Sequence, residues 1–250
     1  CGSSALFDDK LTGTIPTETG AMSSLSYIRL HRNSLTGPMP SELGRLSALT
    51  QLNVESGNKF TGEMPTELGK LTGLRGMPVL PGKLPTELGL ATALVTVYFV
   101  GGVEAGSLAT ELGNLAGLQW LLGFGNSLTS TIPTELGRLP VLHTLSLSSN
   151  SLTGPIPTEL GNGGGALREL QLFDNQWGGT LATELGGLTS LTRFEIQRSG
   201  IAGSVPTEIG RATGLAYLNL EDNAFTATLP TELGRIAAAE IFELVRNSLS

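Results

Sequence analysis

A five-residue motif, Pro-Thr-Glu-Leu-Gly, recurs along the chain at nearly constant spacing. Intact copies occupy residues 65–69, 85–89, 133–137, 157–161 and 230–234, and near-copies occupy residues 16–20, 40–44, 109–113, 182–186 and 206–210. The glutamates of successive copies are separated by 24, 25, 20, 24, 24, 24, 25, 24 and 24 residues. A fixed period of this length indicates one structural unit copied along the chain, because each unit buries its apolar side only against its neighbours. The spacing therefore predicts a single solenoid over residues 1–250, with about ten turns.

The composition excludes several classes of partner and location. The formal net charge is −7 and there is no basic stripe, so we expect no nucleic acid partner. No run of about 18 apolar residues exists, so we expect no membrane span in this segment. Cys1 is the only cysteine, so an internal disulfide is impossible.

Residues 142–157 give the clearest single turn. Leu145 and Leu147 alternate with threonine and serine, which predicts a short strand with its apolar side facing inward. Asn150 and a Thr-Gly turn follow, after which Pro157 fixes its φ angle and Thr158 can cap a short helical turn. Because a lone strand leaves backbone groups unpaired on both edges, we expect the strands of neighbouring turns to form a parallel sheet with a spacing of ~4.8 Å.

The pattern L-x-x-L-x-L-x-x-N-x-L-T-G-x-I-P resembles the leucine-rich repeat family, and its L-T-G-x-I-P element is similar to the plant-type subclass. That subclass occurs in receptor ectodomains, secreted inhibitors and algal proteins. The resemblance covers essentially the whole chain. It implies an α/β solenoid, a right-handed superhelix with a concave parallel β-sheet and short 3-10 or helical turns on the convex side.

Further expectations follow from the resemblance. A second short strand should lie near each L-T-G-x-I-P element. One asparagine of each regular turn should be buried and bonded to backbone groups. These asparagines are residues 33, 58, 126, 150, 175, 223 and 247. The resemblance also implies a secretory or extracellular location, with an organelle lumen as the alternative.

The turns between residues 74 and 109 are irregular. The turn that begins at Leu74 is four residues short and lacks the asparagine, and the next turn has Gly102 at the asparagine position. Neither end carries the polar cap that a terminal repeat normally needs. We therefore expect the chain to be truncated at both ends, either as a segment of a longer protein or as a chain whose ends a partner covers.

The recurring threonines form one ladder along the chain, and the recurring glutamates form a second. Each ladder could in principle bind a ligand. A threonine ladder could bind ice, but helix capping explains these threonines better. The glutamates could bridge a cation, but a solvated acidic stripe near helix N-termini explains them better. His31 and His143 lie several turns apart without a third ligand, and no nucleophile–base pair is apparent. We therefore expect no metal, no cofactor and no enzymatic activity.

The outward positions of the predicted strands point to the concave face as the binding surface. Its centre is apolar and aromatic, its flanks are polar, and this is the usual anatomy of a protein interface. The alternative is repacking in the irregular turns, with Tyr98 and Val100 in the core and Gly123 exchanging places with its neighbours. Trp177 occupies an inward position. The candidate partner-binding residues are Tyr98, Val100, Trp120, Leu122, Phe124, Phe173, Tyr27 and Tyr217.

These observations favour a non-catalytic recognition module or scaffold that binds another protein or a peptide through its concave face. One alternative is a structural subunit built into a larger complex. A second alternative is an ice- or polysaccharide-binding protein that uses the threonine ladder or the concave aromatic residues.

Overall fold

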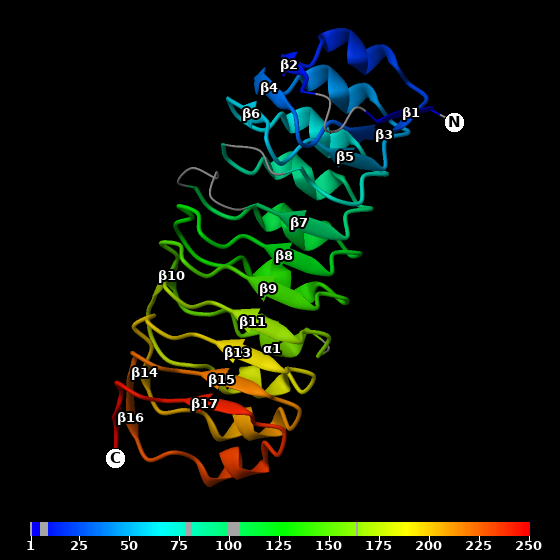
Figure 1. Cartoon of the computed structure of the whole chain (residues 1–250). Helices are drawn as coiled ribbons and strands as arrows, with labels where there is room; N and C mark the ends of the chain where they lie inside the picture. Colours follow the sequence, from blue (N-terminus) through cyan, green and yellow to red (C-terminus); the bar gives the residue numbers. More distant parts are fainter. Residues whose placement is uncertain (1, 6–9, 79–81, 100–105, 164) are drawn as a thin grey trace.

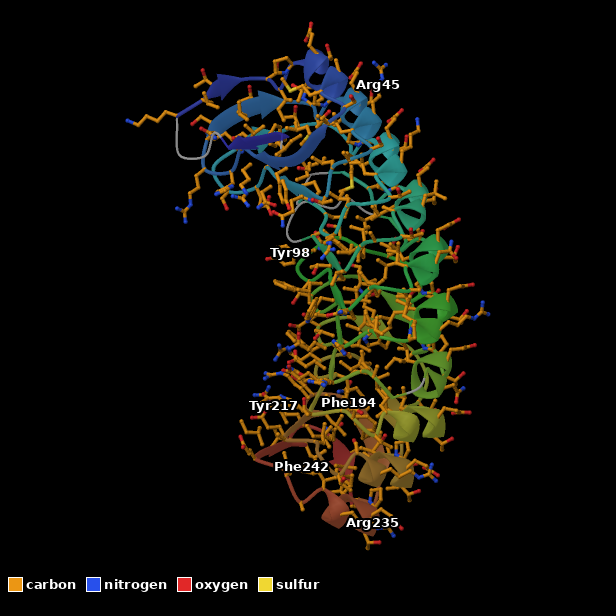
Figure 2. The ribbon with its side chains drawn as sticks, turned by 90° about the vertical axis from the view of Figure 1, so that its right-hand side faces the viewer. Arg45, Tyr98, Phe194, Tyr217, Arg235 and Phe242 are labelled. Carbon is orange, nitrogen blue, oxygen red and sulfur yellow. The ribbon has the colours of Figure 1, made fainter. Side chains whose placement is uncertain are left out.

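The computed structural model describes residues 2–5, 10–78, 82–99, 106–163 and 165–250. Successive turns of the chain stack as coils, with the two ends of the chain at opposite ends of the stack (Figure 1). Each regular coil has a strand on the inner side and a short helical turn on the outer side (Figure 2). The molecule is thus an α/β solenoid, as the sequence predicts.

The inner strands pair in parallel, but they form two sheets rather than one. A three-stranded sheet has the order β1-β3-β5, and a seven-stranded sheet runs from β7 to β17. The strands are β1 (Gly2–Ala5), β3 (Leu25–Arg29), β5 (Gln51–Asn53), β7 (Thr96–Tyr98), β8 (Trp120–Leu122), β9 (Thr144–Ser146), β11 (Glu169–Gln171), β13 (Arg193–Glu195), β15 (Tyr217–Asn219) and β17 (Ile241–Glu243). The concave parallel sheet that the sequence predicts is present but interrupted at the short coil, where, among the described residues, an isolated bridge joins Gly76 to Thr96.

A second set of short strands lies at or just before the Thr-Gly positions of the repeat. These strands form three small parallel sheets, β2-β4-β6, β10-β12 and β14-β16-β18. Their bounds are β2 (Thr12–Gly13), β4 (Ser34–Gly37), β6 (Lys59–Phe60), β10 (Thr153–Gly154), β12 (Gln176–Trp177), β14 (Ala202–Gly203), β16 (Ala224–Ala227) and β18 (Ser248–Leu249). Gly37, Gly154 and Gly203 have positive φ angles there, where glycine is favoured.

Every copy of the five-residue motif forms a short outer helix. Nine copies form 3-10 helices: η1 (Thr17–Ala21), η2 (Ser41–Arg45), η3 (Thr66–Lys70), η4 (Thr86–Leu90), η5 (Thr110–Asn114), η6 (Thr134–Arg138), η7 (Thr183–Gly187), η8 (Thr207–Arg211) and η9 (Thr231–Arg235). The tenth forms the α-helix α1 (Glu159–Asn162). Arg45 and Arg235 lie on this outer side, opposite Tyr98 and Tyr217 (Figure 2).

The prediction that the threonines cap these helices is wrong. The N-cap of each 3-10 helix is the proline or alanine before the threonine or serine, and no N-cap side chain, Thr158 of α1 included, makes a capping hydrogen bond. Instead, nine threonine hydroxyls donate to the carboxylate of the following glutamate at 3.1–3.4 Å. The ladder is a row of local Thr–Glu pairs.

The motif glycine is required by the close approach of consecutive coils. A Cβ atom on Gly137 would lie less than 3.0 Å from the backbone and the Cβ atom of Glu159 in the next coil. A Cβ atom on the motif glycine of each of the eight other coils that are followed by a further copy of the motif would also lie less than 3.0 Å from the backbone of the next motif glutamate. Since none of these glycines has a positive φ angle, steric room rather than turn geometry selects glycine here.

The asparagine ladder joins each coil to the one before it. The Oδ1 atom of Asn150 accepts from the Leu128 N–H at 3.1 Å, and its Nδ2 atom donates to the carbonyls of Gly123 and Leu147. Asn33 and Asn175 are buried, and the other asparagines of the ladder are half-buried. Their backbone bonds confirm the role that the sequence resemblance implies.

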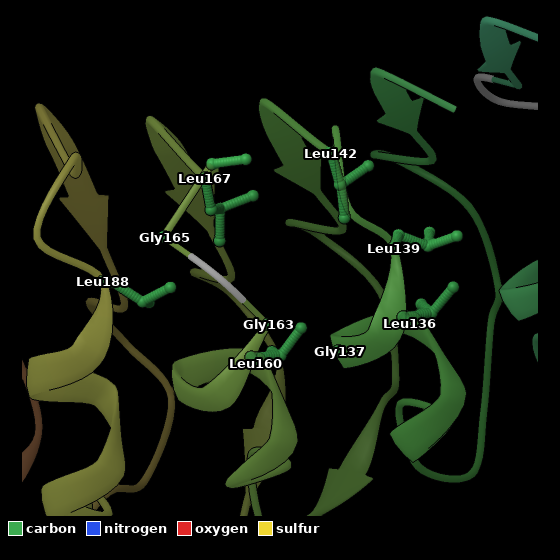
Figure 3. Close-up of a pocket in the computed structure, with 10 residues that line it drawn as sticks. Leu136, Gly137, Leu139, Leu142, Leu160, Gly163, Gly165, Leu167 and Leu188 are labelled. Carbon is green, nitrogen blue, oxygen red and sulfur yellow. The ribbon is translucent and has the colours of Figure 1, made fainter. Parts of the chain in front are cut away.

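The interior consists mainly of leucine, with a few larger side chains at irregular places. Trp177 is buried and its indole N–H donates to the Leu172 carbonyl at 2.8 Å, as its inward position predicts. A void of about 10 Å³ lies among leucines and glycines next to α1 (Figure 3). Because a void of this size is at the lower limit for one water molecule, the core here is essentially filled.

Candidate functional site: the concave face

An aromatic cluster, which we define as Tyr98, Trp120, Leu122 and Phe124, occupies the centre of the concave face. The side chains of Tyr98, Trp120 and Phe124 are 36–38% exposed, and that of Leu122 is half-buried. The intervening Leu121 and Gly123 are buried. The alternation predicted from the sequence therefore holds in these coils, and the repacking alternative does not apply to the four residues. Val100 lies outside the described residues.

The cluster is held by contacts between side chains of neighbouring coils. The Tyr98 and Phe124 rings meet edge to face with centroids 6.2 Å apart, and Trp120 meets His143 in the same way at 6.2 Å. Such pairs contribute about 0.5–1.5 kcal/mol beyond area burial. Three consecutive coils thus position one apolar surface.

The remaining candidate residues do not join this cluster. Tyr27 is exposed on β3, in the other sheet. Phe173 and Tyr217 are half-buried in later coils, beyond the short side chains of β9. The guanidinium group of Arg193 lies 4.3 Å from the Tyr217 ring centroid, so a cation covers this ring.

The C-terminal half of the concave face carries a polar network. Glu195 is buried, its Oε1 atom pairs with Arg193 Nε at 2.5 Å, and Gln171 Nε2 donates to the same oxygen at 3.1 Å. The hydrogen bond to Glu195 raises the pKa of Arg193 above its usual value. In the next coils Asn219 donates to the Glu243 carboxylate. Because these groups are partnered within the chain, this network offers a partner less free polar surface, whereas the aromatic cluster exposes three rings side by side.

A groove of about 520 Å³ opens at the break between β5 and β7. Its walls are formed by the two strands and by the short coil between them, and Tyr98 stands at its rim. The lining residues are Gln51, Leu52, Asn53, Glu55, Arg75, Gly76, Met77, Val95, Thr96 and Tyr98. The short coil is apparent in the sequence, but the groove is not. The missing four residues and Pro78, which cannot donate to a ladder, are the signal that could have revealed it.

Neither a metal site nor a membrane-spanning helix is found within the described residues. No group of three histidine, cysteine, aspartate or glutamate side chains could hold a metal ion there. None of the helices in that part of the chain is long and apolar enough to cross a membrane.

The stacked coils, the asparagine ladder and the concave strands define a leucine-rich repeat solenoid. The family model for the Leucine Rich Repeat matches residues 24–46 and 141–162. A search of curated proteins finds no match. The family match and the fold support a plant-type leucine-rich repeat protein.

Solved structures are similar over nearly the whole chain. The crystal structure of PEPR1-AtPEP1 has a TM-score of 0.87 and 29% identity, and the match covers 95% of this chain and 34% of that one. The plant peptide hormone receptor RGFR1 in complex with RGF2 has a TM-score of 0.80 and 27% identity, with 99% and 48% covered. This chain therefore spans about a third to a half of the length of these two. A plant ice-binding protein, with a TM-score of 0.74, 24% identity and coverages of 96% and 78%, shares the fold.

Proposed function

We propose that this chain is a non-catalytic recognition module that binds a peptide or another protein through its concave face. The observation that carries the proposal is the aromatic cluster, whose three rings stay more than a third exposed at the centre of the concave face. Exposed apolar patches on a monomer generally mark interaction sites. The peptide complex of the similar receptor RGFR1 gives independent support for a peptide as the ligand.

The same comparison supports a secretory or extracellular location, since the similar protein is a peptide hormone receptor. The threonine ladder supports ice binding less well. Its hydroxyl groups are already engaged with glutamate carboxylates on the convex side, and the resulting row is charged. Assembly into a larger complex remains compatible with peptide recognition, because the cluster occupies only the centre of the concave face.

The first test removes two rings of the cluster. The probes are peptides selected from a random display library on the wild-type chain. Trp120→Ala with Phe124→Ala should weaken their binding by about tenfold or more, because buried aromatic anchors are worth ≥ 2 kcal/mol at an interface. Titration calorimetry measures the loss, and circular dichroism verifies that the double variant is folded.

Leu90→Ala is the matched control. Leu90 is 57% exposed at the end of η4 on the convex side, so its truncation deletes exposed apolar surface away from the site. Binding by Leu90→Ala should equal that of the wild type. Equal binding by the double variant and the wild type would contradict the proposed site.

A further inference from the structure

The C-terminal half of the concave face carries more carboxylates than guanidinium groups. Outside the outer helices, residues 165–250 include seven acidic and four basic side chains, which gives a net charge of −3. Six of the carboxylates lie on the concave face or at its rim, and we call them the acidic surface. They belong to Glu169, Asp174, Glu195, Glu221, Asp222 and Glu243. This surface begins two strands beyond the aromatic cluster, at β11.

The arginines of this half do not neutralise the acidic surface. Three of them lie among its carboxylates, and each is already paired at 2.5–3.5 Å. The pairs are Arg193 with Glu195, Arg198 with Asp174, and Arg246 with both Glu221 and Asp222. Among the described residues, the Glu169 carboxylate forms neither a hydrogen bond nor an ion pair. Three guanidinium groups thus face six carboxylates, and an excess of negative charge remains.

Part of this negative charge is open to a partner. The side chains of Glu221 and Asp222 are 22% and 41% exposed, and Glu169 is half-buried. An excess of charge of one sign attracts ligands of the opposite sign and speeds their association. The acidic surface therefore favours a cationic partner.

Gln197 supplies a second, independent indication of a ligand at this surface. It follows β13 on the concave side, in the position that Glu221 occupies in the next coil. The Arg198 N–H donates to the Glu221 carbonyl at 3.0 Å, which places the two positions side by side. Gln197 is 7% exposed, and its buried Oε1 atom has no hydrogen-bond partner among the described residues. Since buried acceptors nearly always have a donor, a ligand that brings one would complete this site.

We propose that the ligand of this chain is a cationic peptide, which packs an apolar side chain on the aromatic cluster and places a lysine or arginine side chain on the acidic surface. The inference rests on the proposed function and names the chemistry of its ligand. Ammonium and guanidinium groups carry only donors, so one such group can bond to the Glu221 carboxylate and to Gln197 Oε1 together. The last torsion of a glutamine side chain rotates easily, which lets this oxygen turn toward the bound cation.

The strand order sets the spacing of the two contacts. Because β8, β9, β11, β13 and β15 are consecutive neighbours in the sheet, Glu169 lies two strand steps and Glu221 four steps from Trp120. At about 4.8 Å per step, these separations are roughly 10 and 19 Å. An extended peptide advances about 3.3 Å per residue, so its cationic residue should lie about three to six residues from its apolar one.

The surface between the two contacts leaves room for such a peptide. On its concave side β9 carries only threonine and serine, which are the short residues Thr144 and Ser146. Tyr98 and Tyr217, on either side of β9, lie along the same inner side of the stack (Figure 2). A peptide that runs across the strands can therefore reach both contacts.

The main test removes two carboxylates of the acidic surface. In Glu169→Gln with Glu221→Gln, Arg246 keeps Asp222 as its partner, so no cation is left unpaired. The probes are peptides selected from a random display library on the wild-type chain, and they should carry lysine or arginine at the stated spacing from an apolar residue. The double variant should bind them about threefold or more weakly in low salt. The loss should lie mainly in the association rate and should shrink in high salt.

Glu67→Gln with Glu135→Gln is the matched control. These two glutamates are half-buried like Glu169 and Glu221, but they lie on the convex side in η3 and η6. The control removes the same charge from the chain and should bind as the wild type does.

Gln197→Leu separates recognition from a structural role. It removes an acceptor that has no partner in the folded chain, so the variant should be at least as stable as the wild type in urea unfolding. It should nevertheless bind the selected peptides about threefold or more weakly. Unchanged binding by this variant would overturn the contact with Gln197.

The outcomes distinguish this inference from the proposed function. If the selected peptides lack basic residues at this spacing and bind the Glu169→Gln, Glu221→Gln variant as tightly as the wild type, a cationic ligand is excluded. Recognition by the aromatic cluster then stands, provided that Trp120→Ala with Phe124→Ala still weakens binding. If neither double variant weakens binding, both proposals fail.

Discussion

At the scale of single residues, the motif glycine decides how closely the coils can stack. Because a Cβ atom on Gly137 would collide with the backbone of Glu159, Gly137→Ala must push two coils apart. We expect it to lower the free energy of unfolding by about 1–3 kcal/mol, the usual cost of overpacking. Urea denaturation followed by circular dichroism measures the change.

The chain contains its own control for this variant. Gly234 is the same motif glycine in the last copy, but a Cβ atom there would meet nothing within 4 Å. Gly234→Ala should therefore be neutral, or slightly stabilising because alanine loses less backbone entropy than glycine on folding. Equal destabilisation by the two substitutions would show that backbone conformation, and not stacking, selects glycine.

At the scale of neighbouring elements, a large and a small residue compensate each other beneath the aromatic cluster. The Phe99 ring is buried after β7 and fills the space that a side chain at position 123 would take. A Cβ atom on Gly123 would lie less than 3.0 Å from this ring. In other coils this inward position holds leucine, isoleucine or valine.

A double-mutant cycle tests this compensation. Gly123→Ala alone overpacks the core, and Phe99→Leu alone leaves a cavity, so we expect each to cost about 1–3 kcal/mol. The double variant should recover part of both losses, with a coupling energy of about 1 kcal/mol or more. Additive losses in thermal or urea unfolding would contradict direct packing between the two residues.

The regular coils could be predicted from the sequence because their side chains repeat. Leu145, Asn150 and Trp177 lie where the pattern places them, since each is determined by contacts with an equivalent neighbour. The caps could not be predicted in this way. The proline before Thr158 and its counterparts already sets the backbone, and the nearby glutamate takes the hydroxyl hydrogen bond.

The candidate site was predictable in its apolar half only. The alternation of Trp120, Leu121 and Leu122 fixed which side chains face outward. The groove depends instead on what a shortened coil does to its two neighbours. The Arg75 N–H still bonds to the preceding coil, whereas the Met77 N–H bonds to β7 in the next coil. The repeat pattern does not indicate at which residue this separation begins.

At the scale of the whole molecule, charges of alternating sign connect the last coils. Asp174, Arg198, Asp222 and Arg246 occupy one position in four consecutive coils, all with positive φ angles between 51° and 57°. Arg198 forms two hydrogen bonds with Asp174, at 2.5 and 3.0 Å, and Arg246 pairs with Asp222 at 3.3 Å. In a solenoid, contacts between neighbouring coils determine the stability of the stack. This row of charges therefore contributes to holding the C-terminal coils together.

The row makes stability depend on pH in a defined direction. The hydrogen bond from Arg198 lowers the pKa of Asp174 below its usual value, although burial acts in the opposite sense. The unfolded chain, with its Asp pKa of about 3.9, then binds protons at a higher pH than the folded chain does. The stabilisation is thus complete above about pH 4 and is lost as the pH falls through the lower folded pKa.

Asp174→Asn should remove this dependence. Because the pair is partly exposed and screened, we expect the variant to be less stable than the wild type by about 0.2–1 kcal/mol at pH 7. The difference should shrink toward zero as the pH falls through the lowered pKa of Asp174, because the wild-type carboxylate is then protonated as well. Urea unfolding from pH 7 down into this acidic range measures the difference.

Glu240→Gln is the control, since Glu240 is exposed and forms no ion pair among the described residues. A stability difference for Asp174→Asn that does not shrink as the Asp174 carboxylate becomes protonated would show that the charge row does not link the coils, and that aspartate matters there only for its backbone conformation.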